Sequence, residues 1–173
     1  MPLDLLSVLM RIKIISITCL NKMYHVSTIQ LYLVIRMRII RGVIEVATSD
    51  RFQALNVTSI IETWVKEQKL SNGLLLVYVP HTTAALTVNE AERGLMSDIV
   101  TFLKELTYEG KSWRHNIIDD NAHAHLSSIL TGYSIILPVI DGRLDLGTWQ
   151  QIILLEMDGP RRRKIKLFFM GET

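Results

Sequence analysis

Residues 73–90 read GLLLVYVPHTTAALTVNE, and the change halfway along this stretch decides how the chain is organised. Its first part is a short apolar run, which is typical of a buried strand. The large aliphatic residues then give way to small and hydroxyl residues between His81 and the pair Asn89 and Glu90. A core strand would carry Val, Ile and Leu throughout. We therefore interpret 80–90 as the wall of a site rather than as a core strand.

The two polar ends of this wall are far apart if the chain is extended. At about 3.3 Å per residue, His81 and Asn89 would be separated by roughly 26 Å in a straight strand, which is too far for one small-molecule site. Two explanations remain open. Either the chain bends at the small residues 83–85, or one end of the wall serves a neighbouring subunit.

Apolar patterning elsewhere predicts further strands and helices. Strands are expected at 38–48, 73–80, 133–140, 151–157 and 162–170, and helices at 57–70, 91–107 and 122–131, the last with Asn121 as its N-cap. Asp-Gly pairs in 141–144 and 158–161 are typical of turns. Strands with inserted helices predict an α+β domain whose core is a β-sandwich or a strongly bent sheet, of about seven strands with two to three helices.

Residues 1–36 differ from the rest of the chain. They are aliphatic, lack glycine and show no regular period, whereas Met37 begins an alternating segment. We predict that Met37 is the natural start, that 1–36 are an upstream extension and that 37–173 form one domain; an extra strand or helix is the alternative. Charged residues interrupt the apolar runs of 1–36, so neither a membrane span nor a signal peptide is expected.

Charge and cysteine content limit the expected partners. From Met37 onward, 15 Lys and Arg stand against 16 Asp and Glu, a net charge of −1. General attraction to nucleic acid is therefore not expected. Cys19 is the only cysteine in the sequence, so no disulfide can form within the chain. These features favour a cytoplasmic protein that binds neither nucleic acid nor membranes.

Four histidines from Met37 onward are candidate ligands, because neutral imidazole is a common metal ligand. His81 follows Pro80 at the end of the predicted strand 73–80, and His115 lies in a polar loop. His123 and His125 would lie about 200° apart around the third predicted helix, so only one of them can face a given site. His125 is on the apolar side of that helix. We expect it to point inward, and we expect His123 to be solvated.

Two other segments offer polar groups. Gly147 permits close backbone approach, and Thr148 and Gln150 could form uncharged hydrogen bonds with a ligand. A turn followed by a core Trp149 explains that segment equally well. The basic run 160–164 is best explained as a solvated strand edge, and phosphate binding by one arginine is the alternative.

Taken together, these segments closely resemble the YjbQ-like family, also named the secondary thiamine-phosphate synthases. The motifs are VPHTTAALTVNE at 79–90, HN at 115–116, NAHAHL at 121–126, LTGYSIILPVIDGRLDLGTWQ at 130–150 and DGPRRRK at 158–164. The resemblance implies an α+β fold built on a β-sandwich and a homotrimer with sites near subunit boundaries. It also implies a weak transferase activity that joins a pyrimidine pyrophosphate to a thiazole phosphate and yields thiamine phosphate.

The reaction implied by the resemblance displaces pyrophosphate from carbon. Its site must neutralise the leaving group with a divalent metal or with cationic and N–H donors. The recurring histidines of the family correspond to His81, His115 and His125 here. We expect these three to form one cluster that binds a divalent metal, zinc or magnesium, or an anion.

The other family motifs extend the expected site. The family's Asn-Glu pair corresponds to Asn89 and Glu90, and its Gly-Thr-Trp-Gln to 147–150. We expect Glu90, Asp98 and His125 to be catalytic. The expected contacts to a small phosphorylated substrate are Thr82, Thr83, Asn89, Asn121, Thr148, Gln150 and Arg161. The alternative function is a trimeric protein that binds a metal or a small ligand and whose enzymatic activity is incidental.

Overall fold

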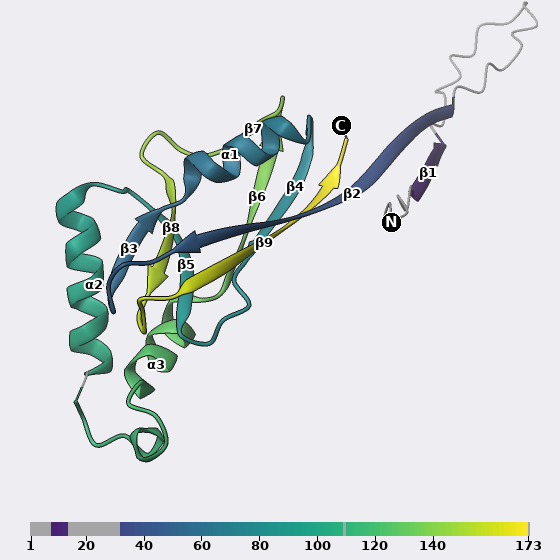
Figure 1. Cartoon of the computed structure of the whole chain (residues 1–173). Coiled ribbons are helices and arrows are strands. Elements are labelled where there is room, and N and C mark those ends of the chain that lie inside the picture. The colour runs from purple at the N-terminus through teal and green to yellow at the C-terminus, as the bar shows by residue number, and fades with distance from the viewer. Residues whose placement is uncertain (1–7, 14–31, 109, 173) are drawn as a thin grey trace, which may run out of the picture.

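The computed structural model describes residues 8–13, 32–108 and 110–172 (Figure 1). The elements, in chain order, are β1 (Val8–Lys13), β2 (Tyr32–Ala47), β3 (Gln53–Asn56), α1 (Thr58–Glu67), β4 (Gly73–Tyr78), β5 (Ala84–Asn89), α2 (Arg93–Thr107), the short 3-10 helix η1 (Arg114–Ile117), α3 (Ala122–Thr131), β6 (Ser134–Ile140), β7 (Arg143–Leu144), β8 (Gln151–Glu156) and β9 (Arg162–Gly171). The predicted α+β class is confirmed, and each of the three predicted helices forms.

The strands form two antiparallel sheets. One has six strands in the order β1-β2-β9-β4-β6-β7, and the other has three in the order β3-β8-β5. Strands β3 and β7 were not among the predicted strands, because four and two residues are too few to show a period. The described residues therefore contain more strands than the expected seven or so.

The three-stranded sheet is buried on both of its faces. Along β8, Ile152 and Leu154 join the main core, which they share with the six-stranded sheet and α1. Ile153 and Leu155 join a second core beneath α2 and α3. Figure 1 shows these two helices together on one side of the molecule. Burial on both faces explains why β8 is an unbroken apolar run rather than an alternating one.

The interpretation of 80–90 as a site wall rather than a core strand is wrong for the part that forms β5. Ala84, Ala85 and Leu86 are completely or almost completely buried, so this part is a core strand. Its residues are small because α3 packs closely against it: the Ser128 hydroxyl donates a hydrogen bond to the Ala84 carbonyl at 3.0 Å. Only the turn before β5 remains available as a site wall.

The register of β5 tests the bend that was one explanation for its distant polar ends. Residues 84–89 pair without interruption with 156–151 of β8, so the chain does not bend at 84–85, and the explanation by a neighbouring subunit stays a prediction. His81 lies in the turn before β5, and Asn89 is its last residue. The two ends of the predicted wall therefore lie at opposite ends of the three-stranded sheet.

The N-terminal part of the chain contributes a hairpin to this fold. Val8–Lys13 pairs with Tyr32–Met37, the first part of β2, and Figure 1 shows these paired strands at one end of the six-stranded sheet, extending away from the rest of the described chain. The rest of 1–36, with Cys19, lies outside the described residues, so the start-site prediction remains a prediction. Among the described residues, no helix has both the length and the apolar character needed to cross a membrane.

Candidate functional site

Most of the predicted site residues line one polar hollow, which we call the histidine hollow. Its volume is about 490 Å³, and its lining comprises Pro80, His81, Thr82, Thr83, His115, Ile118, Asp119, Asn121, His125, Asp158, Arg161 and Arg163. These residues come from the turn between β4 and β5, the segment from η1 to α3, the turn between β8 and β9, and the start of β9. The fold brings them together because β5, β8 and β9 all begin or end at this side of the molecule.

Two of the histidines that line the hollow are in contact with each other. The rings of His115 and His125 meet edge to face, with 4.9 Å between their centroids. Burial, followed by the positive charge that His115 can carry, lowers the pKa of His125 below its ordinary value. His125 is therefore mainly neutral at pH 7 and can donate or accept a hydrogen bond.

His81 approaches the hollow from the turn before β5. Its Nε2 accepts a hydrogen bond from the backbone N–H of Lys164 at 2.9 Å. Burial and then the nearby Arg163 guanidinium lower the pKa of His81. Like His125, this side chain is therefore mainly neutral at pH 7.

Asn121 holds several parts of the hollow together. Its side-chain NH₂ group donates hydrogen bonds to Asp119 Oδ2 at 2.7 Å and Asp158 Oδ2 at 3.1 Å, and its Oδ1 lies 3.1 Å from His115 Nε2. Asn121 does occupy the N-cap position of α3, but its side chain makes no capping hydrogen bond. The Oδ1 of Asn116 accepts the N–H of Ala122 instead, at 3.1 Å.

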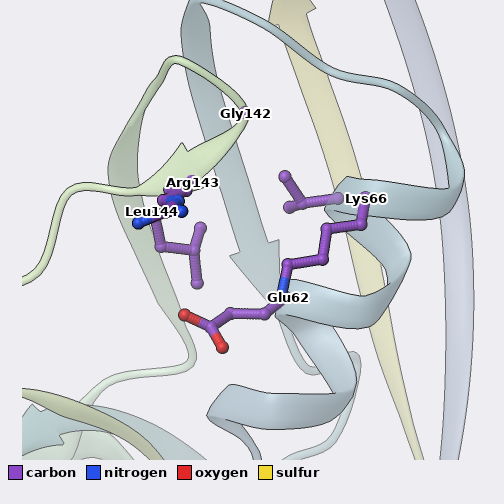
Figure 2. Close-up of a pocket in the computed structure, with 6 residues that line it drawn as sticks. Glu62, Lys66, Gly142, Arg143 and Leu144 are labelled. Carbon is purple, nitrogen blue, oxygen red and sulfur yellow. The ribbon is translucent and has the colours of Figure 1, made fainter.

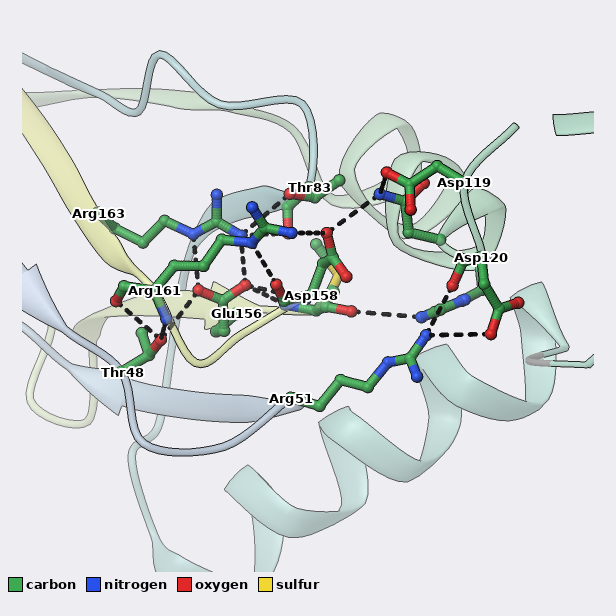
Figure 3. A network of polar contacts seen from close by, with 12 residues as sticks. Thr48, Arg51, Thr83, Asp119, Asp120, Glu156, Asp158, Arg161 and Arg163 are labelled. Atoms are coloured by element: carbon green, nitrogen blue, oxygen red, sulfur yellow. Dashed lines mark hydrogen bonds and ion pairs between the residues drawn. The ribbon is translucent and has the colours of Figure 1, made fainter. Parts of the chain in front are cut away.

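Two arginines fix the loops around the hollow (Figure 3). Arg161 donates from Nε to the Asp158 carbonyl at 2.6 Å and from Nη2 to the Asp158 carboxylate at 2.7 Å. Arg51 donates to the carbonyl of Asp120 at 2.6 Å, which ties the segment before α3 to the rest of the domain. The side chain of Arg161 remains exposed at the edge of the hollow.

A buried ion pair borders the hollow through Arg163. Glu156 is 0% exposed and Arg163 4% exposed, and their side chains form two hydrogen bonds of 2.6 and 2.5 Å. Arg163 also donates to the Thr83 hydroxyl at 3.0 Å. The prediction that 160–164 is a solvated edge is wrong for Arg163 and correct for Arg162, which is exposed. A lone glutamate directly after the apolar residues of β8 was the sequence signal for this pair.

The three predicted metal ligands share the hollow but are not arranged around one point. Within the described ranges, no group of three His, Cys, Asp or Glu side chains could hold a metal ion. His81 and His115 already use one ring nitrogen each in the hydrogen bonds described above. The arrangement does not fit a metal held by this chain alone, so zinc or magnesium binding stays a prediction.

Five predicted site residues do not line the hollow: Asn89, Glu90, Asp98, Thr148 and Gln150. Asn89 is at the far end of β5, where its Oδ1 accepts the N–H of Glu90. Gln150 accepts the N–H of Gly147 at 2.8 Å in the loop before β8, and Asp98 is exposed on α2. Trp149 is 71% exposed, so the alternative of a core Trp149 is wrong.

The expectation that His123 is solvated is also wrong. His123 is 1% exposed, lies 3.3 Å from the Met157 carbonyl through Nε2, and contacts the ring of Phe52. The helical geometry was correct in placing His123 and His125 on different faces. The face with His123 packs against the three-stranded sheet, and His125 borders the hollow.

A second, smaller hollow lies between α1 and the turn before β7 (Figure 2). It has a volume of about 180 Å³ and is lined by Glu62, Val65, Lys66, Gly142, Arg143 and Leu144. No predicted site residue lines it. The histidine hollow is the candidate functional site, because seven of the predicted site residues line it.

Comparison with known proteins agrees with the resemblance drawn from the motifs. The family model for UPF0047 protein YjbQ-like matches residues 42–172. A UPF0047 protein of Archaeoglobus fulgidus is 47% identical over 118 residues, which are 68% of this chain and 91% of that protein.

Two solved structures extend the similarity to the fold. The crystal structure of the hypothetical protein APE1520 from Aeropyrum pernix K1 has 53% identity and a TM-score of 0.76, and the match covers 77% of this chain and 99% of that one. A YbjQ-like protein of unknown function (SSO2532) from Sulfolobus solfataricus P2 has 45% identity and a TM-score of 0.77, with coverage of 79% and 99%. The chain belongs to the YjbQ-like UPF0047 family, a family of unknown function.

Proposed function

We propose that the histidine hollow binds a small phosphorylated substrate and that the chain is a transferase of the thiamine-phosphate synthase type. In this reaction, a pyrimidine pyrophosphate and a thiazole phosphate are joined. The observation that carries the proposal is the gathering of Arg161 and three histidines in one polar hollow of about 490 Å³. That volume is within the range of small-molecule sites.

Arg161 is well placed to receive an anion. Two of its N–H groups are held by Asp158, so the planar guanidinium has a fixed orientation before any ligand binds. An arginine side chain carries five N–H donors, and its remaining donors suit the oxygens of a phosphate. Because the side chain is already held in place, it loses less conformational entropy when a ligand binds.

The reaction requires stabilisation of a leaving group. The thiazole nitrogen forms a bond to the carbon that carries the pyrophosphate, the C–O bond breaks, and the pyrophosphate leaves with the electron pair. Charge therefore builds up on the departing oxygens, where preorganised N–H donors are most effective. Arg161 and the imidazole N–H of His125 are the donors we assign to this role.

A second candidate function is binding of a small ligand without efficient turnover. Glu90 and Asp98, which the sequence analysis expected to be catalytic, lie outside the hollow. The carboxylates inside it, Asp119 and Asp158, are already engaged with Asn121 and Arg161. A hollow with no uncommitted carboxylate suits a binding protein as well as it suits a transferase.

The proposal is tested by comparing Arg161→Ala with Arg162→Ala, which removes a neighbouring arginine. We expect the unaltered protein to release pyrophosphate only when both substrates are present. Arg161→Ala is expected to weaken binding of the pyrimidine pyrophosphate about tenfold, because it removes a charge-assisted contact to the phosphates. Arg162→Ala is the control: Arg162 is exposed and does not line the hollow. Titration calorimetry gives the affinity, and a pyrophosphate assay gives the turnover.

Each outcome of this experiment separates the candidates. Binding that weakens in Arg161→Ala, together with pyrophosphate release, supports the transferase. Binding that weakens without any release by the unaltered protein supports the second candidate. Equal affinities in Arg161→Ala and Arg162→Ala would contradict a phosphate site in this hollow.

We also propose that the chain assembles as a homotrimer. The outer face of the six-stranded sheet supports an assembly, because exposed apolar side chains are neighbours on it: Ile39, Val43, Leu74, Ile136 and Met170. Contiguous apolar surface of this kind often marks an interface between proteins. The number three comes from the family resemblance alone.

Light scattering is expected to give a particle mass three times that of one chain. Ile136→Lys places a charge in the apolar face and is expected to lower that mass. Ile129→Lys is the matched control, since Ile129 is equally apolar and exposed but lies on α3. A particle mass that Ile136→Lys leaves unchanged would exclude this face as the interface.

A further inference from the structure

We infer that the hydrogen bonds of the histidine hollow place the ring hydrogen of the neutral form on different nitrogens in two of its histidines: on Nε2 in His115 and on Nδ1 in His81. The positions of the protons are independent of any ligand. Only their roles in the reaction rest on the proposed function. Asn121, through its contacts with two carboxylates, is the residue that sets the proton of His115.

The orientation of the Asn121 amide is decided by its neighbours. The NH₂ group lies 2.7 Å from Asp119 Oδ2 and 3.1 Å from Asp158 Oδ2. Asp158 Oδ2 also accepts a hydrogen bond from Arg161 Nη2 at 2.7 Å. An ionised carboxylate can only accept hydrogen bonds. If the Asn121 amide were turned by about 180°, its oxygen would face two carboxylate oxygens and none of the three could donate. Asn121 is 4% exposed, so water has little access to satisfy that arrangement.

This orientation fixes the proton of His115. With the NH₂ group on the carboxylates, Oδ1 of Asn121 faces Nε2 of His115 at 3.1 Å. An amide oxygen can only accept, so Nε2 must carry the hydrogen. In the neutral ring the lone pair is then on Nδ1. This is the nitrogen of His115 that remains to accept a proton or a hydrogen bond from a ligand.

The opposite assignment holds for His81. Its Nε2 lies 2.9 Å from the backbone N of Lys164, and a backbone N–H can only donate. Nε2 of His81 must therefore hold a lone pair, and the hydrogen of the neutral ring is on Nδ1. A protonated His81 would set two N–H groups against each other.

The two assignments specify what a ligand should offer. His115 offers a lone pair and His81 offers an N–H, and both side chains line the same hollow as Arg161. A ligand that satisfies all three carries anionic oxygen for His81 and Arg161, and an N–H or O–H group for His115. Under the proposed function, this describes a phosphorylated substrate with a polar N–H or O–H group near its phosphate.

Nitrogen-15 NMR of the full chain tests the assignment without any substrate. Long-range proton–nitrogen spectra at pH 8 distinguish the two neutral forms of each histidine, and His115→Gln and His81→Gln identify the signals. We expect the Nε2–H pattern for His115 and the Nδ1–H pattern for His81. An Nδ1–H pattern for His115, or an Nε2–H pattern for His81, would overturn the inference even if the protein proves to be a transferase.

A variant of Asn121 tests the role of this residue separately. Asn121→Leu removes both the amide oxygen and the NH₂ group, so His115 is expected to shift from one form to a mixture of the two. His81 is the internal control, because its partner is the backbone of Lys164 and its pattern is expected to persist. An unchanged His115 pattern in a variant that keeps the His81 signal would show that Asn121 does not set the proton.

Discussion

Replacing Glu156 with alanine is expected to destabilise the protein by about 3–5 kcal/mol and to lower the melting temperature by roughly 10 °C. Glu156 is fully buried and accepts hydrogen bonds from the Arg163 guanidinium, the Thr48 hydroxyl and two backbone N–H groups, those of Met157 and Asp158. Without the carboxylate, the charge of Arg163 would remain buried with no counter-charge. Differential scanning calorimetry measures the change.

Two further variants separate the ion pair from a general loss of charge. Arg162→Ala removes an exposed arginine beside the pair and is expected to change the melting temperature very little. The double variant Glu156→Leu with Arg163→Met removes both charges and is expected to be more stable than Glu156→Ala. If Glu156→Ala melts within about 2 °C of the unaltered protein, which corresponds to about 0.5–1 kcal/mol, the buried pair is not important for stability.

Replacing His125 with alanine is expected to reduce transferase turnover about 100-fold, the effect of losing one N–H donor to a developing anion. His125 borders the hollow, and burial and His115 keep it mainly neutral by lowering its pKa. Its loss should reduce the rate of pyrophosphate release more than it reduces substrate affinity, because leaving-group charge develops only as the bond breaks.

The control for His125→Ala is Ile129→Ala, one turn further along α3 and exposed to solvent. Turnover by the control should match that of the unaltered protein. Particle mass and melting temperature show whether either variant disturbs the fold. Equal turnover in His125→Ala and Ile129→Ala, with both proteins folded, would remove His125 from the reaction.

Local sequence signals were sufficient for most of the secondary structure. Helix α3 spans Ala122–Thr131, the range expected from its apolar pattern and from the stop at Gly132. Strand β8 was recognisable as an apolar run. The spacing of apolar residues in a helix or a strand involves only residues close together in the chain, so it can be recognised in a single sequence. Strand β3, with four residues, shows no such period.

The candidate site was predictable only in part. His81, His115 and His125, with Thr82, Thr83, Asn121 and Arg161, do line one hollow. The predicted exposure of a side chain was wrong where the residues around it come from distant parts of the chain. Arg163 is buried because Glu156 and Thr83 surround it, and His123 because its side of α3 packs on the three-stranded sheet.

The sequence by itself determined the α+β class, the three helices and which family the chain belongs to, because these depend on local periods and on contiguous motifs. Only the tertiary structure decided which polar residues meet. It separated Asn89 from His81 by the length of β5, and it buried Glu156 with Arg163. It also placed Asn121 between two carboxylates and a histidine. The physical reason is that hydrogen-bond partners and burial come from chain segments tens of residues apart, whose contacts no local pattern records.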